Sequence, residues 1–266
     1  MSGRAVLVVV TAAIALAIAA PAAQAQPPVG IVRPGDESGL SVKELGAQLY
    51  AGNCASCHGV DGRGVVPPPR RPGSGAIEGA GPPLRGVGAR AADFYLRTGY
   101  MPLGRPGEQP RRSPPSFDGH EIDALVSYIA GLAPGPPIPK ASPGSGDIAQ
   151  GQRVFTEHCA GCHQIVGQGG VVTGARVPPL QDATAVQIKE AVRTGPYLMP
   201  RFSSRQIGPR ELDSLVAYVL STRHPPNRGG WGLGNIGPFP EGMVTWLIAA
   251  VVLVATCRII GKRVRR

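Results

Sequence analysis

Two short motifs in this sequence place cysteine and histidine close enough together to share one chemical task. They are Cys54–His58 (CASCH) and Cys159–His163 (CAGCH), each with two thiols separated by two residues and followed at once by a histidine. Thiols at this spacing add across the two vinyl groups of one porphyrin, and the histidine then lies beneath the iron. The motifs therefore predict two covalently bound haem c groups. The predicted haem-binding residues are Cys54, Cys57, His58, Cys159, Cys162 and His163.

Other uses of such a motif fit the sequence less well. A structural zinc site needs about four ligands, and each copy offers three, with no fourth cysteine or histidine at a typical spacing. A thioredoxin-like redox pair needs a βαβ setting, which the surrounding pattern does not predict. The fifth cysteine, Cys257, lies alone in an apolar segment near the C-terminus, so no disulfide framework is expected.

A sixth iron ligand is predicted for each haem from the scarce methionines. Apart from the initiator there are three, and Met101 and Met199 each follow a haem motif by about forty residues and precede a proline. The third, Met243, belongs to the C-terminal apolar segment. A methionine is commonly core filler, but two scarce ones at equivalent points are better explained as ligands. A thioether opposite an imidazole favours ferrous iron and closes the iron to oxygen or peroxide, as electron transfer requires.

The sequence gives less specific predictions for the remaining histidines and for several arginines. His120, His158 and His224 are expected to be solvated or locally bonded. Four loop arginines could steer an acidic partner, although solvated loops are the slightly favoured interpretation. These arginines are Arg70, Arg71, Arg111 and Arg112.

The elements that must position these residues occur twice along the chain. Residues 40–132 and 146–224 each give the order helix, Cys-x-x-Cys-His, Gly-rich loop, Pro-Pro-Leu, short helix, Thr-Gly, Met-Pro, helix. The Pro-rich residues 133–145 between them form a linker that is expected to be semi-rigid. We call these segments the first repeat and the second repeat.

Local signals define the helices of both repeats. Ser41 with Glu44, and Asp118 with Glu121, have the spacing of capping boxes at the starts of the first and last helices of the first repeat. Pro209 suits the first position of the last helix of the second repeat. Apolar stripes follow along one face of each last helix. The stripes consist of Ile122, Leu125, Val126 and Ile129, and of Leu212, Leu215, Val216 and Val219.

Both ends of the chain predict a relationship with a membrane. Residues 1–25 read as an export signal with Arg4, an apolar run and a small-residue cleavage site, or as an uncleaved anchor. Residues 242–261 are long and apolar enough for a transmembrane helix, with a buried core helix as the alternative. The basic residues 262–266 then predict a cytoplasmic C-terminus by the positive-inside rule, and this is preferred to nucleic-acid binding. Residues 26–39 and 225–241 are expected to be connecting segments, the second rich in Gly and Pro.

Each repeat resembles a class I cytochrome c domain. The resemblance rests on a glycine and two aromatics at a crossing of the terminal helices and on a Pro-Pro-Leu loop whose carbonyl accepts a hydrogen bond from the ligand histidine. It implies that Pro82 and Pro178 orient His58 and His163. The helix-crossing residues are Gly46, Tyr50 and Tyr128, and Gly151, Phe155 and Tyr218. The fold predicted is all-α, with two tandem cytochrome c domains and one C-terminal transmembrane helix.

The whole chain after the signal resembles the di-haem cytochrome cc subunit of the actinobacterial cytochrome bcc complex. Residues 229–243 and the stretch around Met199-Pro200 are especially similar to that subunit. The resemblance implies a menaquinol–cytochrome c reductase subunit without a substrate site of its own. It would relay electrons from a Rieske iron–sulfur protein, beside cytochrome b, to an aa3-type terminal oxidase. The haem domains would lie outside the bacterial cell membrane, and tethering would replace a diffusing carrier.

Three other functions compete with this one. They are a stand-alone anchored di-haem carrier of the c4 type, the cytochrome subunit of a periplasmic dehydrogenase, and a di-haem peroxidase. The peroxidase needs an open iron, so the two predicted methionine ligands count against it.

Overall fold

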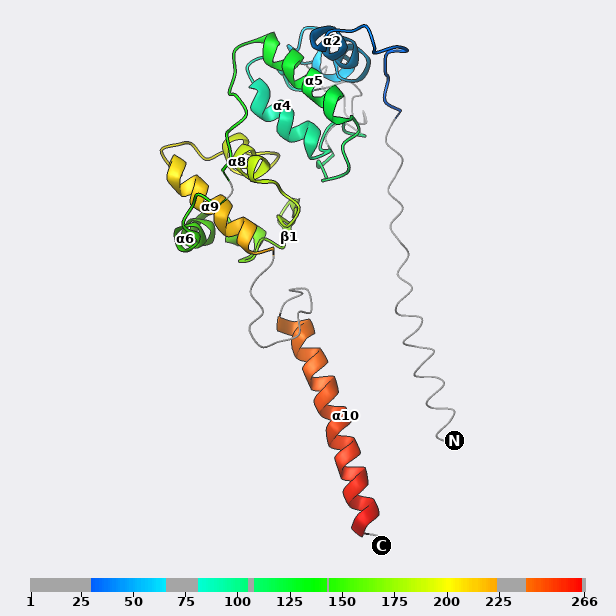
Figure 1. Cartoon of the computed structure of the whole chain (residues 1–266), viewed down its shortest axis with the longest axis vertical. Coiled ribbons are helices and arrows are strands. Elements are labelled where there is room, and N and C mark those ends of the chain that lie inside the picture. The colour runs from blue at the N-terminus through cyan, green and yellow to red at the C-terminus, as the bar shows by residue number, and fades with distance from the viewer. Residues whose placement is uncertain (1–29, 66–80, 105–107, 143, 224–237, 265–266) are drawn as a thin grey trace, which may run out of the picture. The chain divides into compact units, whose positions relative to one another are not determined.

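A computed structural model describes residues 30–65, 81–104, 108–142, 144–223 and 238–264 of the chain. In these ranges the chain is helical apart from one short hairpin, which agrees with the predicted all-α class. It divides into one compact unit, Met1–Leu220, which contains nearly all of both repeats, and a second unit, Ser221–Arg266 (Figure 1).

The described part of the first repeat consists of α2 (Val42–Asn53), α3 (Ala55–His58), α4 (Gly88–Arg97) and α5 (Gly119–Leu132). Both predicted capping boxes are confirmed. The N–H of Ser41 donates to the Glu44 carboxylate at 2.9 Å, and the N–H of Glu44 donates to Oγ of Ser41 at 3.3 Å. Asp118 and Glu121 form the same reciprocal pair at the start of α5. These side chains accept from backbone donors that a helix start otherwise leaves without partners.

The core of the first repeat lies where α2 crosses α5. A Cβ on Gly46 would overlap the backbone carbonyl of Ala124, so only glycine permits this close approach. The ring of Tyr50 lies 5.0 Å from that of Tyr128 across the crossing. The predicted apolar stripe of α5 is buried against α2, with Leu125 fully enclosed.

The second repeat is built in the same order. It consists of α6 (Ile148–His158), α7 (Ala160–His163), β1 (Gly170–Val172), β2 (Ala175–Val177), α8 (Ala185–Thr194) and α9 (Pro209–Ser221). Gly151 lets α6 approach the carbonyl of Ser214 on α9, and the rings of Phe155 and Tyr218 lie 5.3 Å apart. As predicted, α9 begins at Pro209.

The hairpin of β1 and β2 was not predicted from the sequence. Val172 pairs with Ala175, so only Thr173 and Gly174 form the turn, and Gly174 has a φ of 82°. Tight two-residue hairpin turns need positive φ, which glycine adopts without strain. The signal was therefore a Thr-Gly pair between two short segments that contain valine.

Within the first unit, α4 of the first repeat packs beside α8 of the second (Figure 1). The linker between the repeats is bonded to both of these helices. The carbonyl of Pro136 accepts from the N–H of Arg90 at 3.1 Å, and that of Lys140 accepts from Nζ of Lys189 at 2.8 Å. These bonds hold the linker against the repeats, and its stiffness stays a prediction.

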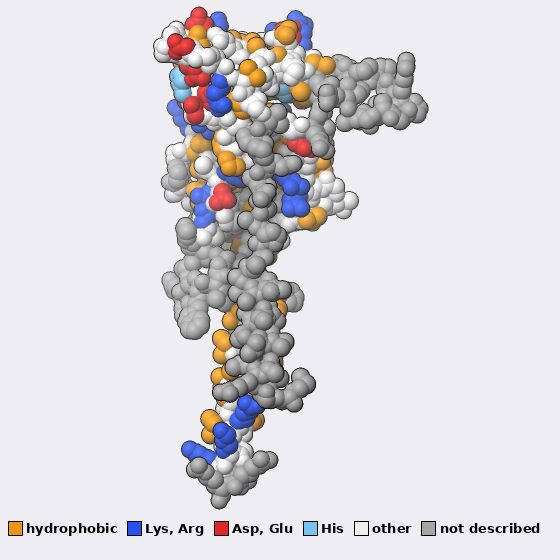
Figure 2. Space-filling model, turned by 90° about the vertical axis from the view of Figure 1, so that its right-hand side faces the viewer, with side chains coloured by type: hydrophobic (Ala, Val, Ile, Leu, Met, Phe, Trp, Pro, Cys, Tyr) orange, Lys and Arg blue, Asp and Glu red, His pale blue; other side chains and the backbone are white. Residues whose placement is uncertain are grey.

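The second unit contains one long helix, α10 (Pro238–Val264), in which Gly242–Arg263 is long and apolar enough to cross a membrane. Its described side chains are exposed, unlike those of a buried core helix, which favours the predicted span over that alternative. Figure 2 shows hydrophobic side chains along α10 and basic side chains near its C-terminal end. The predicted export signal (1–25), most of the connector 225–241 and residues 265–266 lie outside the described residues.

Candidate functional site

In the first repeat, the end of α2 and the short helix α3 present the Cys-x-x-Cys-His motif. Cys54 caps α2, with its N–H donating to the carbonyl of Tyr50, and Cys57 and His58 lie on α3. Nδ1 of His58 lies 2.7 Å from the carbonyl oxygen of Pro82. Since a carbonyl only accepts, Nδ1 carries the proton and Nε2 keeps its lone pair for a metal.

Met101 packs against the same part of the first repeat's core as this motif. Both Met101 and Cys54 pack against the same buried cluster of α2, α4 and α5 residues, although 47 positions separate them in the sequence. The fold thus gives the motif and the methionine one shared apolar surface.

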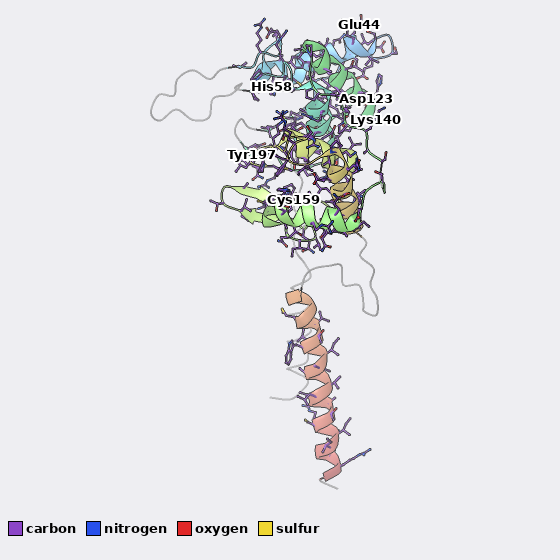
Figure 3. All side chains as sticks on the ribbon, turned by 90° about the vertical axis from the view of Figure 1, so that its left-hand side faces the viewer. Glu44, His58, Asp123, Lys140, Cys159 and Tyr197 are labelled. Atoms are coloured by element: carbon purple, nitrogen blue, oxygen red, sulfur yellow. The ribbon has the colours of Figure 1, made fainter. Side chains whose placement is uncertain are left out.

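The second repeat presents its motif in the same way. Cys159 caps α6 (Figure 3), and Cys162 and His163 lie on α7. Nδ1 of His163 lies 3.2 Å from the carbonyl oxygen of Pro178. Burial lowers the pKa of His163, and the bond to Pro178 opposes this shift only in part. The ring is therefore neutral at pH 7, which is the form that binds iron.

A cavity in the second repeat brings its candidate ligands together. Cys159, His163 and Met199 all line it, and it opens to solvent on one side. Most of its other lining side chains are apolar, among them Leu180, Ile188 and others of α8 and α9. Cofactor pockets are typically concave and lined mostly by apolar side chains, so the chain's own residues fit an apolar group such as a haem, and His163 and Met199 are the residues that would hold its iron. Iron ligation by these residues stays a prediction.

Two of the four motif thiols, those of Cys54 and Cys159, are unsuited to rival chemistry. Burial, with a smaller effect of the neighbouring thiol, raises the pKa of Cys54 to about 12 and that of Cys159 to about 11. A redox or nucleophilic cysteine needs a lowered pKa, because the thiolate is the reactive form. In the described part of the chain, no three His, Cys, Asp or Glu side chains are grouped as a zinc site requires.

The other described histidines do not line the cavity of the second repeat. His120 is exposed in the first turn of α5, and His158 ends α6 beside the ring of Phe202. His224 lies outside the described residues, as do Arg70 and Arg71. Cys257 is exposed on α10.

One expectation was wrong, and the residue concerned lies at the cavity. For Arg112 a solvated loop was slightly favoured over steering of an acidic partner, but its side chain lines the cavity of the second repeat together with Phe94 and Tyr100. All three come from the first repeat. No sequence signal pointed to them, because their role depends on how the two repeats pack.

Comparison with protein families matches both repeats separately. The family described as "Cytochrome c" matches residues 43–133, and the family described as "Cytochrome C oxidase, cbb3-type, subunit III" matches residues 146–219. Both matches contain a Cys-x-x-Cys-His motif and the methionine that follows it.

Curated relatives match nearly the whole chain. The cytochrome bc1 complex cytochrome c subunit of Mycobacterium bovis is 36% identical over 94% of this chain and 88% of its own. The subunit of the same name from Corynebacterium diphtheriae is 34% identical over 82% of this chain and 80% of its own. A more distant relative is the cbb3-type cytochrome c oxidase subunit CcoP of an Azospirillum strain, 28% identical over 65% of this chain and 60% of its own.

Proposed function

This chain belongs to the family of cytochrome c subunits of the cytochrome bc1 complex, and on that premise we propose that it is a membrane-anchored electron relay with two covalently bound haems. It takes electrons from the Rieske iron–sulfur protein of a menaquinol-oxidising complex and passes them to an aa3-type terminal oxidase. The observation that carries this proposal is the cavity in which Cys159, His163 and Met199 meet, in a repeat whose order of elements the first repeat shares.

The residues that would hold each haem are those of the two motifs. Cys54 and Cys57, and Cys159 and Cys162, would form the thioether links. When bound, each haem supplies an iron that changes by one electron. The protein's own contribution would be to fix the imidazole plane: the carbonyl oxygens of Pro82 and Pro178 accept from Nδ1 of His58 and His163, which leaves Nε2 as the atom that would bind the iron.

Met101 and Met199 would complete the two iron sites. A thioether donates weakly to ferric iron, so this ligand raises the potential and leaves no position for a substrate. The apolar side chains that pack around Met199 would limit the access of water to the iron site. The chain therefore acts within a quinol–cytochrome c reductase as a carrier without a substrate site of its own.

The anchor and the basic end of α10 support one orientation. Lys262 and Arg263 lie in the last turn of α10, at the end of the apolar span, and basic flanks remain on the cytoplasmic side. Both haem domains then lie outside the cell membrane. Tethering them there raises their effective concentration near fixed partners and removes the need for a diffusing carrier.

Affinity purification of the full chain from mild detergent tests this function. Cytochrome b and the Rieske protein should be recovered with it, together with the subunits of an aa3-type oxidase. A matched sample in harsher detergent, which separates membrane complexes, should yield the chain alone. Recovery as a lone chain under both conditions would favour the stand-alone anchored carrier and overturn the assignment to the complex.

A further inference from the structure

The cavity of the second repeat is not formed by the second repeat alone. Phe94 of α4, Tyr100 just after the end of α4 and Arg112 from the segment that precedes α5 supply part of its lining. Phe94 and Tyr100 are buried, and their rings meet edge to face with centroids 5.5 Å apart. The first repeat therefore closes part of the wall around the candidate ligands His163 and Met199.

Arg112 is held in this wall by the second repeat. Its Nη2 donates to the carbonyl oxygen of Asp182 at 2.8 Å and to Oε1 of Gln187 at 2.9 Å. Gln187 is fixed in turn, because its Oε1 also accepts from the N–H of Thr184 in the capping box that begins α8. Both bonds use one nitrogen of the guanidinium, which also carries N–H groups on its other two nitrogens.

A second contact fixes the segment that carries Arg112. Three positions earlier, Oε1 of Gln109 accepts from the N–H of Arg176 on β2 at 2.9 Å, and the Gln109 amide donates to the carbonyl of Arg176. Residues 109–112 therefore bridge β2 and the start of α8. Arg111, next to Arg112, is exposed and does not line the cavity. The two neighbouring arginines differ in position and not in charge.

We propose that docking of the first repeat completes the haem pocket of the second, and that Arg112 raises the reduction potential of the haem held there. This inference rests on the proposed function, because it requires a haem at Cys159 and Cys162. Reduction adds one negative charge to the haem, so a fixed cation in the wall favours the reduced form. Phe94 and Tyr100 exclude water from the same wall, which lowers the local dielectric and strengthens this effect.

Redox titration of the full-length holoprotein, followed by haem absorption, tests the inference. Arg112→Gln should make the equilibrium constant for reduction of one haem about tenfold smaller, a fall of about 59 mV for one electron. The other haem should keep its potential. Arg111→Gln removes the same charge from an exposed position and should change neither potential. Arg112→Lys retains the charge and should keep the potential close to that of the wild type.

The affected haem must be the one of the second repeat. A Met199→His background identifies it, because replacement of the axial ligand moves that potential. The inference is overturned if Arg112→Gln moves neither potential, if it moves only the first haem, or if Arg111→Gln has the same effect. It is also overturned if Arg112→Lys behaves like Arg112→Gln. A wild-type haem assay that finds fewer than two haems would overturn the proposed function together with this inference, whereas two haems with unmoved potentials would overturn this inference alone.

Discussion

The carboxyl group of Glu190 on α8 lies against that of Asp93 on α4, where the two repeats pack together. Glu190 is completely buried and Asp93 nearly so. Asp93 accepts from Nε of Arg97 at 2.7 Å, whereas no donor among the described residues reaches either carboxyl oxygen of Glu190. Two ionised carboxylates can only accept, so the pair is satisfied when Glu190 keeps a proton and shares it with Asp93.

Glu190→Gln should make the stability of the protein less dependent on pH. Burial, and then Asp93, raise the pKa of Glu190 to about 8, against the opposing effect of Arg97 and Arg90. A raised folded-state pKa means that stability is full below the ordinary pKa of 4.5 and is lost as pH rises through about 8. The variant keeps an uncharged hydrogen-bonding group at this position. Its free energy of unfolding should therefore exceed that of the wild type by an amount that grows with pH, to the order of 2 kcal/mol at pH 9.

Urea unfolding of the holoprotein at pH 6 and pH 9 measures this difference. Glu157→Gln is the matched control, because Glu157 is exposed on α6, and it should leave the pH dependence unchanged. If the free energies of unfolding of Glu190→Gln and the wild type differ by the same amount at both pH values, Glu190 does not titrate in this range.

Gly151→Ala should destabilise the second repeat by about 2 kcal/mol or more, because the added methyl group overlaps the backbone of Ser214 and the crossing of α6 and α9 must open. Gly131→Ala is the matched control. Gly131 also lies in a helix, and a Cβ there meets nothing within 4 Å. That variant should be neutral or slightly stabilising, since alanine favours a helix. Equal effects on urea unfolding would contradict the close-approach argument.

Met199→Ala should abolish the sulfur-to-ferric-iron absorption band of one haem, and Met101→Ala that of the other, because each removes one proposed thioether ligand. Difference spectra of the oxidised protein against the wild type measure the loss. Met243→Ala removes an exposed methionine on α10 and should leave both bands intact. If Met199→Ala keeps the sulfur-to-ferric-iron bands of both haems, Met199 is not an iron ligand.

Deletion of residues 238–266 should release the haem domains from the membrane, because the apolar span Gly242–Arg263 is lost. The fraction of haem recovered in the soluble phase after a carbonate wash measures this, with the full-length chain as the control. Retention of the truncated chain in washed membranes would mean that a second anchor is present, as expected if residues 1–25 are not cleaved.

Much of the fold followed from local sequence signals. The capping boxes at Ser41 and Asp118 could be predicted because each involves two residues only three positions apart, whose side chains accept hydrogen bonds from each other's backbone N–H groups. The helix start at Pro209 and the apolar stripes of α5 and α9 were equally local. The hairpin of β1 and β2 was missed because its strands are only three residues each, too short for an alternating pattern to emerge.

The sequence by itself determined the chemistry of this protein. Two Cys-x-x-Cys-His motifs, each with a distant methionine in a repeated order of elements, predict two haem sites, since residue type and spacing are sufficient for that inference. Only the tertiary structure decided what surrounds those sites. Arg112 enters the cavity of the other repeat, and Glu190 meets Asp93, because α4 packs beside α8. Such packing depends on the fit of two whole surfaces, and no spacing along one chain encodes it.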